Sequence, residues 1–188
     1  MKGLDIRKHA NLHVGMSIQQ PYVVLYINEA LSVLASEYPE TVMRVEDITY
    51  PVTDDKRWHT FEEIENYPPD PPDPYTPLLI KRDMQAVRSM TDENGHMVQG
   101  FEVRNSKVKF PETGTYTMEV FKMPEQLETI NDHPDVPSPY HMAIAAFVAS
   151  REKSRLFGDE DADSLRLYQE FLRQSEKAHL LLKRQKRG

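Results

Sequence analysis

The chain has 188 residues, no cysteine and a formal net charge of −7. This length suits one domain, or one domain with an insertion, and the lack of cysteine excludes disulfides, thiolate catalysis and cysteine-ligated zinc. The negative charge argues against nucleic-acid binding by the whole surface.

Apolar residues make up 39% of the chain, a modest fraction for a globular protein. Either part of the chain is extended and solvated, or neighbouring subunits complete its core. The sequence has no run of about eighteen apolar residues that would span a membrane. Its first residues lack the apolar centre of a signal peptide. We therefore expect a soluble protein that is made in the cytoplasm.

The N-terminal part predicts an arm followed by a helix. Residues 1–16 show no hydrophobic period, so we expect an arm that is mobile or ordered only by a neighbour. From Pro21 to Tyr38 apolar residues recur at spacings of three and four, which predicts a helix that Pro39 ends. Its apolar positions are Val24, Ile27, Leu31 and Leu34.

A segment with a different pattern follows. β-branched and aromatic residues at 42–52 predict one or two strands, and Trp58, Phe61 and Ile64 predict a short helical turn on a sheet. Residues 67–77 contain six prolines, which favour polyproline II and prevent regular sheet pairing. This segment is either a stiff surface loop or a clamp across a neighbouring subunit.

Short strands are predicted in the second half of this segment. Asn94-Gly95 is a strong signal for a two-residue hairpin turn, and Arg104-Asn105-Ser106 predicts another turn. From Gly114 apolar and polar residues alternate, which indicates a strand with one buried face, and Met123-Pro124 ends it. The other predicted strands are 78–80, 86–91, 96–103 and 107–110.

The C-terminal residues predict two amphipathic helices. Ser138 and Pro139 suit the start of the first helix, and Gly158 suits its end. The acidic run 159–163 lies at the favourable end of the next helix dipole. The predicted apolar stripe of that helix is Leu165, Tyr168, Leu172, Ser175, His179 and Leu182, with Phe171, Ala178 and Leu181 beside it.

Taken in order, these elements predict an α+β fold. Residues 17–41 and 134–188 form a helical bundle, made of the N-terminal helix and a C-terminal α-hairpin. Residues 42–133 form a small antiparallel β module inserted into that bundle.

The sequence carries few signs of catalysis. It has no nucleotide-binding motif and no nucleophile elbow. Adjacent carboxylates such as Asp54-Asp55 and Glu62-Glu63 do not converge on one point, because neighbouring side chains diverge on a strand or a helix. We therefore expect a protein that is not an enzyme, with no catalytic residue.

Four residues are the nearest approach to a metal cluster. Asp132, His133, Asp135 and His141 have suitable side chains, but a linker punctuated by prolines spreads them apart. We therefore expect neither a metal nor a cofactor, and a turn at His133-Pro134.

The order of these segments and their local sequences resemble those of head-to-tail connector (adaptor) proteins of tailed bacteriophages. The resemblance covers roughly residues 18–183. The segments that carry it are Ile27-Asn28-Glu29-Ala30-Leu31, Glu37-Tyr38-Pro39, Lys107-Val108-Lys109-Phe110, Gly114-Thr115-Tyr116, Met123-Pro124, Pro139-Tyr140-His141, Arg151-Glu152, Arg155-Leu156-Phe157-Gly158, and the helix with Tyr168, Phe171 and Leu172.

The resemblance implies a structural role in the virion neck. Such adaptors form a ring of about twelve identical subunits beneath the portal protein. The ring extends the channel for double-stranded DNA, which it passes without sequence-specific binding, and presents a platform to the tail or the next neck ring. The implied location is the head–tail junction of the virion, after synthesis in the host cytoplasm, and no membrane is involved.

Three sets of residues follow as hypotheses. The residues expected to dock on the portal are Leu182, Lys183, Arg184, Lys186 and Arg187. The residues expected at the subunit interface are Tyr75, Tyr140, Arg151, Arg155 and Tyr168. The acidic residues expected to face the channel are Asp54, Asp55, Glu62 and Glu63.

Alternatives remain open at this point. The basic C-terminus suits a solvated helix end as well as docking on an acidic protein or a nucleic-acid backbone. The chain is also compatible with another neck or tail-completion ring, or with a small cytosolic regulatory module that grips one partner protein. A metal-dependent hydrolase centred on Asp132, His133 and His141 is a further alternative.

Overall fold

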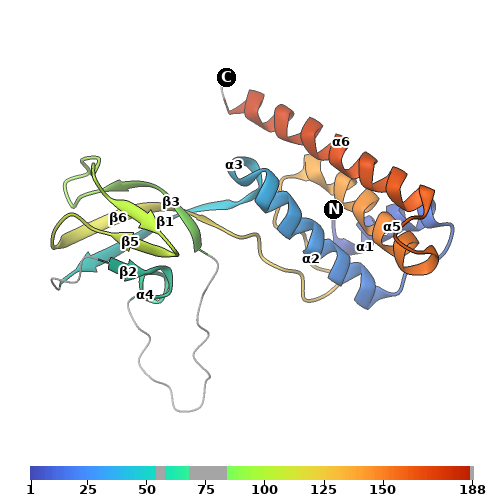
Figure 1. The fold of residues 1–188 in the computed structure, drawn as a ribbon, viewed down its shortest axis with the longest axis horizontal. Coiled ribbons are helices and arrows are strands. Elements are labelled where there is room, and N and C mark those ends of the chain that lie inside the picture. Colours follow the sequence, from blue (N-terminus) through green and yellow to red (C-terminus); the bar gives the residue numbers. More distant parts are fainter. Residues whose placement is uncertain (54–57, 68–83, 187–188) are drawn as a thin grey trace, which may run out of the picture. The chain divides into compact units, whose positions relative to one another are not determined.

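The structure, a computed structural model, describes residues 1–53, 58–67 and 84–186. It contains two compact units (Figure 1). The helical unit comprises Met1–Met43 and Pro124–Gly188, and the β unit comprises Arg44–Met123. Helices therefore flank an inserted antiparallel β unit, which confirms the predicted α+β class.

The insertion is shorter at its C-terminal end than the predicted 42–133. Residues 124–133 belong to the helical unit, where Leu127 and Ile130 are buried. The amide of Asn28 holds this linker, because its Nδ2 donates to the Leu127 carbonyl at 3.0 Å and its Oδ1 accepts from the Leu127 N–H at 2.8 Å.

Helix α1 (Gly3–Val14) occupies the region that was expected to be an arm. Ile6, Ala10 and Val14 are buried at spacings of four, and the helix packs on α5 (His141–Phe157). The arm prediction is wrong because this apolar face is only three side chains long and small in area. Gly3 fits closely, since a Cβ there would lie 2.8 Å from the Ile130 carbonyl oxygen.

Helix α2 (Gln20–Glu37) confirms the first predicted helix. Pro21 occupies its first turn, where the missing N–H needs no partner. Val23, Ile27, Leu31 and Leu34 are buried, whereas Val24 is only partly buried. The short helix α3 (Pro39–Val42) follows directly after Tyr38.

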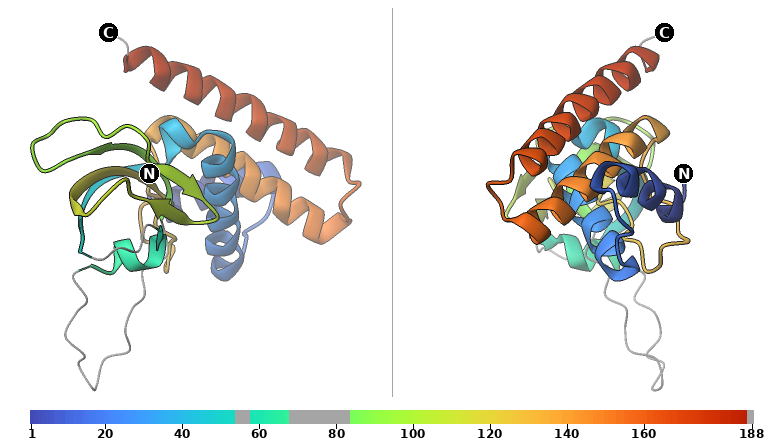
Figure 2. Two further views of the ribbon diagram at one scale, coloured as in Figure 1. Left: turned by 60° about the vertical axis from the view of Figure 1, so that its left-hand side comes forward. Right: turned by 90° about the vertical axis from the view of Figure 1, so that its right-hand side faces the viewer.

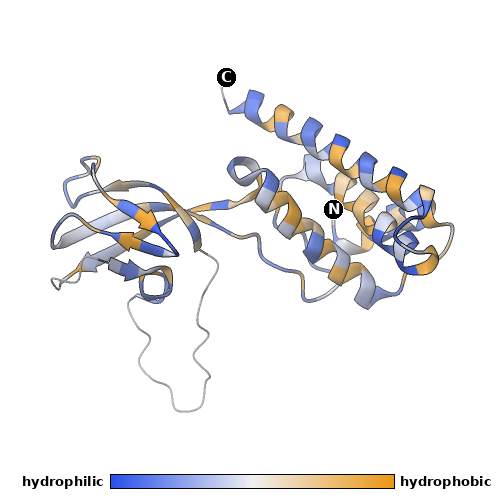
Figure 3. Ribbon diagram, viewed as in Figure 1, coloured by the Kyte–Doolittle hydropathy of each residue, from blue (hydrophilic) through white to orange (hydrophobic). Residues whose placement is uncertain are grey.

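Helix α5 is the centre of the helical unit. A 3-10 turn, η1 (Ser138–Tyr140), precedes it, so Ser138 does not cap the helix as expected. Every residue from Ala143 to Ser150 is buried, because α1, α2 and α6 (Ala162–Gln185) all pack against this helix. Figure 3 shows the apolar residues along α2 and α5.

Helix α6 runs along α5 and extends past it (Figure 2). Asp161 caps it, because its carboxylate accepts from the Ser164 N–H at 2.8 Å. The close approach of the two helices depends on reciprocal hydrogen bonds: Ser150 Oγ donates to the Ser164 carbonyl at 2.9 Å, and Ser164 Oγ donates to the Ser150 carbonyl at 3.0 Å.

The buried face of α6 differs from the predicted stripe. It consists of Ser164, Leu167, Phe171, Ser175 and Ala178. Leu165 and Tyr168, two members of the predicted stripe, are 53% and 36% exposed. The helix is therefore rotated about its axis relative to the sequence prediction, and part of its apolar stripe lies at the surface.

Within its described residues, the β unit contains two small antiparallel sheets. In one, β6 (Gly114–Lys122) lies between β1 (Arg44–Val52) and β3 (Met84–Thr91); in the other, β5 (Lys107–Lys109) lies between β2 (Trp58–Thr60) and β4 (Glu102–Arg104). Tyr116, Met118 and Val120 of β6 are buried, as the alternation predicted. Phe110 stacks on Tyr50 in the same core, with ring centroids 5.9 Å apart.

Two predicted turns have different outcomes. Asn105 and Ser106 both adopt positive φ, 49° and 56°, and close the tight β4–β5 hairpin. Gly95 also turns with positive φ, but residues 96–101 form only one bridge, Thr91 with Met97, rather than a strand.

The predicted helical turn is confirmed as α4 (Phe61–Glu65). The predicted strand 78–80 and residues 68–77 of the proline-rich segment lie outside the described residues.

Candidate functional site

A groove in the helical unit is the candidate interaction site. We define the helical groove as the space of about 600 Å³ between α2 and α6. Both helices pack on α5, so α5 forms the floor. Glu29, Ser32 and Val33 line it from α2; Phe147, Ser150, Arg151 and Ser154 from α5; Ser164, Leu165 and Tyr168 from α6; and Asp159 from the turn between α5 and α6.

The lining of the helical groove is partly apolar and partly polar. Val33, Phe147, Leu165 and Tyr168 contribute apolar surface. The Tyr168 ring packs on Phe147 and Phe171, with centroid distances of 6.2 and 5.8 Å. This packing fixes the tyrosine while leaving 36% of it exposed. The groove therefore offers a pre-formed apolar surface beside polar groups.

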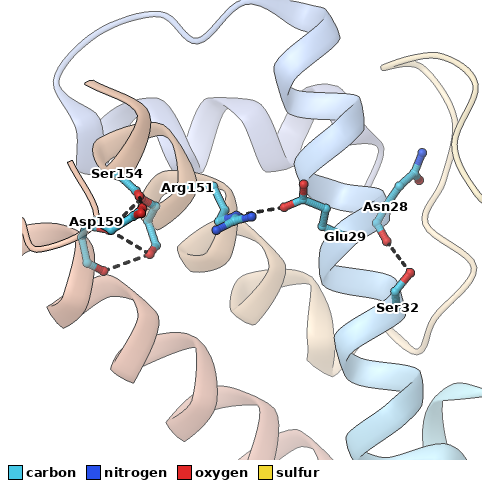
Figure 4. A network of polar contacts seen from close by, with 8 residues as sticks. Asn28, Glu29, Ser32, Arg151, Ser154 and Asp159 are labelled. Carbon is cyan, nitrogen blue, oxygen red and sulfur yellow. Dashed lines mark hydrogen bonds and ion pairs between the residues drawn. The ribbon is translucent and has the colours of Figure 1, made fainter. Parts of the chain in front are cut away.

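The polar side contains an ion pair between α2 and α5 (Figure 4). Arg151 Nε donates to Glu29 Oε2 at 2.9 Å, and both side chains are partly exposed, at 46% and 33%. Ser154 Oγ donates to Asp159 Oδ1, which ties the end of α5 to the acidic turn. Ser32 Oγ donates to the Asn28 carbonyl at 3.1 Å. These contacts hold the charged groups in place.

Arg155 lies one helical turn after Arg151. It makes two hydrogen bonds to the buried Glu152 carboxylate, at 2.8 and 2.7 Å, and its guanidinium lies 4.7 Å from the centre of the Tyr22 ring. The hydrogen bonds to Glu152 raise the pKa of Arg155 above its usual range. This arginine therefore fixes the helix packing and presents one charged edge to solvent.

The five residues expected at the subunit interface are not equivalent. Arg151 and Tyr168 lie in the helical groove, and Arg155 is exposed on α5. The prediction that Tyr140 lies at a surface is wrong, because this residue is fully buried and its hydroxyl lies 2.6 Å from Thr41 Oγ1. Tyr75 lies outside the described residues.

The residues expected to dock on the portal lie at the C-terminal end of α6. Lys183 Nζ is 2.9 Å from Glu40 Oε2, and Lys186 Nζ donates to the Glu40 carbonyl at 2.8 Å. The hydrogen bond from Lys183 lowers the pKa of Glu40. Arg184 is exposed and Leu182 partly buried, while Arg187 lies outside the described residues. Two of these lysines therefore hold α6 onto α3.

The expected acidic channel residues are only partly described. Asp54 and Asp55 lie outside the described residues, whereas Glu62 and Glu63 are exposed on α4. Glu63 Oε2 accepts from the Thr60 N–H at 2.8 Å and completes a capping box. Its carboxylate therefore has a local structural role.

The linker residues do not converge as metal ligands. Asp132 accepts hydrogen bonds from the N–H groups of Glu128 and Thr129, at 3.0 and 2.7 Å, and shapes a turn. His133 is exposed, and His141 is buried in the helical unit. Within the described ranges, no group of three or more His, Cys, Asp or Glu side chains could hold a metal ion.

Sequence reasoning missed most of the helical groove. Glu29 and Phe147 were assigned to helices without a site role, and Leu165 to a core stripe. The available signal was the number of apolar residues on α6, which exceeds what one buried face can cover.

No helix of the described residues has the length and apolar character to cross a membrane.

Comparisons with known proteins add no relative. No protein-family model matches the sequence, and no curated protein is significantly similar to it.

Proposed function

We propose that this chain is a non-enzymatic structural protein of the virion neck of a tailed bacteriophage. About twelve copies would form a ring between the portal and the tail and extend the DNA channel. The order of elements supports this proposal: helices, an inserted antiparallel β unit, then an α-hairpin. It is the order on which the resemblance to connector proteins rests.

The observation that carries the proposal is the apolar surface of the helical unit. Leu165 is 53% exposed and borders the helical groove. Leu12, Leu25 and Phe157 are 81%, 51% and 61% exposed on the same unit. Isolated apolar residues are normal on a protein surface, but a groove with apolar walls marks an interaction site. Contacts between copies would cover such surface.

The C-terminal end of α6 supports a contact with the portal. Leu180 and Leu181 are 49% and 47% exposed there, beside the exposed Arg184. Exposed apolar side chains beside an arginine suit a protein interface, because the core of such interfaces is more apolar than the remaining surface and arginine is enriched there. We assign the portal contact to this end, with the tail or the next neck ring on another face.

Passing DNA would meet an acidic surface. The net charge of the chain is −7, and acidic side chains repel the phosphate backbone, so DNA would slide without binding. Exposed Glu62 and Glu63 remain the candidates within the described residues.

The mass and shape of the assembled protein test this proposal. We expect mass photometry and negative-stain imaging to show a closed ring, formed alone or on the portal of the same virus. A protein that stays monomeric or dimeric with and without that portal would contradict a ring and favour a regulatory module instead. Zinc or manganese bound in solution and lost on His133→Ala and His141→Ala would favour a hydrolase.

A further inference from the structure

We propose that the helical groove of one copy receives the end of α1 from a second copy, with Leu12 and Met16 as the inserted side chains. This inference rests on the proposed function, because it names a second copy of this chain as the partner of the groove. The contact is heterologous: the groove and the inserted residues are different surfaces of the same unit.

The inserted side chains protrude from the helical unit. Leu12 is 81% exposed, because Ile6, Ala10 and Val14 occupy the face of α1 that packs on α5 and Leu12 lies on the other side of the helix. Gly15 ends the helix with a φ of 78°, and Met16 follows it, 47% exposed. Two flexible apolar side chains therefore project from one corner.

The helical groove has the size and lining to receive them. Its volume of about 600 Å³ lies within the range of sites that bury small apolar groups. Val33 and Leu165 form apolar walls on α2 and α6, and Phe147 and Tyr168 form an aromatic surface between them. Inserted Leu12 and Met16 would cover Leu165 and Tyr168, which are otherwise partly exposed.

Charge complementarity selects a second copy as the occupant. Acidic residues lie at the end of the groove beside the α5–α6 turn: Asp159 lines the groove, and Glu160, Asp161 and Asp163 follow it in the chain. Lys153 and Arg166 pair with Asp163, which leaves an excess of negative charge on the turn. The segment that carries Leu12 has a net positive charge: Arg7 and Lys8 precede it on α1, and the one acidic residue of that helix, Asp5, pairs with Lys8 at 3.4 Å. Opposite charges of this kind steer association and fix orientation.

The absence of cysteine makes a direct test possible. A tagged copy carries Leu12→Cys or Met16→Cys, and an untagged copy carries Leu165→Cys or Tyr168→Cys. After mixing and mild oxidation we expect a disulfide between tagged and untagged chains. The control replaces Leu165→Cys by Leu25→Cys, an exposed residue of α2 that does not line the groove, and should give at least about tenfold less product.

The outcomes separate this inference from the proposed function. A closed ring without any of the four cross-links would overturn the groove contact and leave the proposed function standing. Monomers without cross-links at every concentration, with and without portal, would overturn both. A dominant Leu12–Leu12 cross-link would indicate a two-fold contact and also overturn the inference.

A charge reversal provides an independent test. Lys8→Glu should weaken self-association about tenfold, and adding Glu160→Lys should restore it, because the two changes re-create an opposite pair. Both residues are exposed, so circular dichroism should show unchanged folding. Lys177→Glu, an exposed residue of α6 outside the groove, is the matched control. Equal effects of Lys8→Glu and Lys177→Glu, without rescue, would contradict the assigned contact.

Discussion

Lys122 and Glu65 form a buried ion pair in the β unit. Lys122 Nζ lies 3.7 Å from Glu65 Oε1, and the two side chains are 7% and 1% exposed. Glu65 Oε1 also accepts from the Met84 N–H at 2.6 Å, and Lys122 Nζ lies 3.2 Å from Glu46 Oε2. Charges removed from water to this extent depend on their partners.

We expect Lys122→Met to lower the free energy of unfolding by about 3 kcal/mol, because it removes a buried cation from beside the buried Glu65 carboxylate. The double variant with Glu65→Gln should recover part of this loss, since a neutral amide oxygen still accepts from Met84. Urea unfolding measures both. Lys109→Met is the control: its pair with Glu102 is more exposed, at 30% and 39%, and should contribute less than about 1 kcal/mol. Equal losses would contradict a special role for burial.

Tyr140 shows that local sequence does not reveal which distant residues a side chain contacts. An aromatic residue at a helix entrance is compatible with an interface or a core. Its burial depends on Thr41, which is 99 positions earlier in the chain and bonds to its hydroxyl, and on Tyr38, whose ring centroid lies 6.2 Å away. Such long-range contacts leave no local pattern, so the partners that bury Tyr140 could not be predicted, although its helical setting favoured core packing.

Helix α1 is expected to be an integral part of the helical unit. Ile6 is fully buried against α5, so Ile6→Ala should lower the free energy of unfolding by about 2–5 kcal/mol, through lost burial and a residual cavity. Leu12→Ala, on the exposed side of the same helix, should change it by less than about 0.5 kcal/mol. Thermal or urea unfolding tests the pair; an Ile6→Ala variant as stable as Leu12→Ala would restore the picture of a loose arm.

Stability should depend on pH where α6 meets α3. His179 Nδ1 lies 2.9 Å from Thr41 Oγ1, and its ring packs at a tilt against Tyr38, with ring centroids 4.8 Å apart. Burial and the nearby Lys183 lower the pKa of His179 from its ordinary value of 6.5, while Glu40 acts in the opposite direction. Burial also lowers the pKa of His141 in the same unit.

The direction in which stability changes with pH follows from how many protons the folded and unfolded states bind. Above pH 6.5 these histidines are neutral in both states and their contribution to stability is complete. Below that value the unfolded chain binds protons that the folded chain does not, so the free energy of unfolding falls as the pH falls toward the lower folded pKa. His179→Gln should reduce this loss of unfolding free energy between pH 7.5 and pH 5, which is roughly the range over which one histidine titrates. The same substitution at exposed His13 is the control. A fall of unchanged size would exclude His179 as a contributor.

Elements differ in how well their sequence predicts them. Helix α2 and strand β6 could be predicted, because their apolar spacings are long and regular. Helix α1 could not, since its buried face has few large side chains. Ser175 of α6 is buried as predicted, but the orientation of the N-terminal part of this helix was predicted incorrectly. The large residues Leu165 and Tyr168 were expected in the core, whereas the small Ser164 is buried there through close helix packing rather than hydrophobicity. Arg151 and Tyr168 of the helical groove were predicted at an interface, whereas its Leu165 wall was missed because this residue was placed in the core.

At the scale of the whole molecule, the chain crosses between its two units twice. The crossings follow Met43 and Met123. Arg44, the first residue of the β unit, and Lys122, its second-last, are ladder partners of β1 and β6, so their Cα atoms lie within about 5.5 Å of each other. Each unit also has its own buried core. This geometry is that of a domain insertion.

We therefore expect the helical unit to fold and self-associate without the β unit. Replacing residues 44–123 by a short Gly-Ser linker leaves α1, α2, α5 and α6 and the helical groove intact, because a few residues span the gap between the crossings. The variant should melt cooperatively by circular dichroism and retain the Lys8–Glu160 charge dependence of self-association, whereas isolated residues 44–123 should remain monomeric. Loss of cooperative melting would show that the β unit is needed for folding. A folded helical unit that no longer associates would place the contacts between copies on the β unit instead.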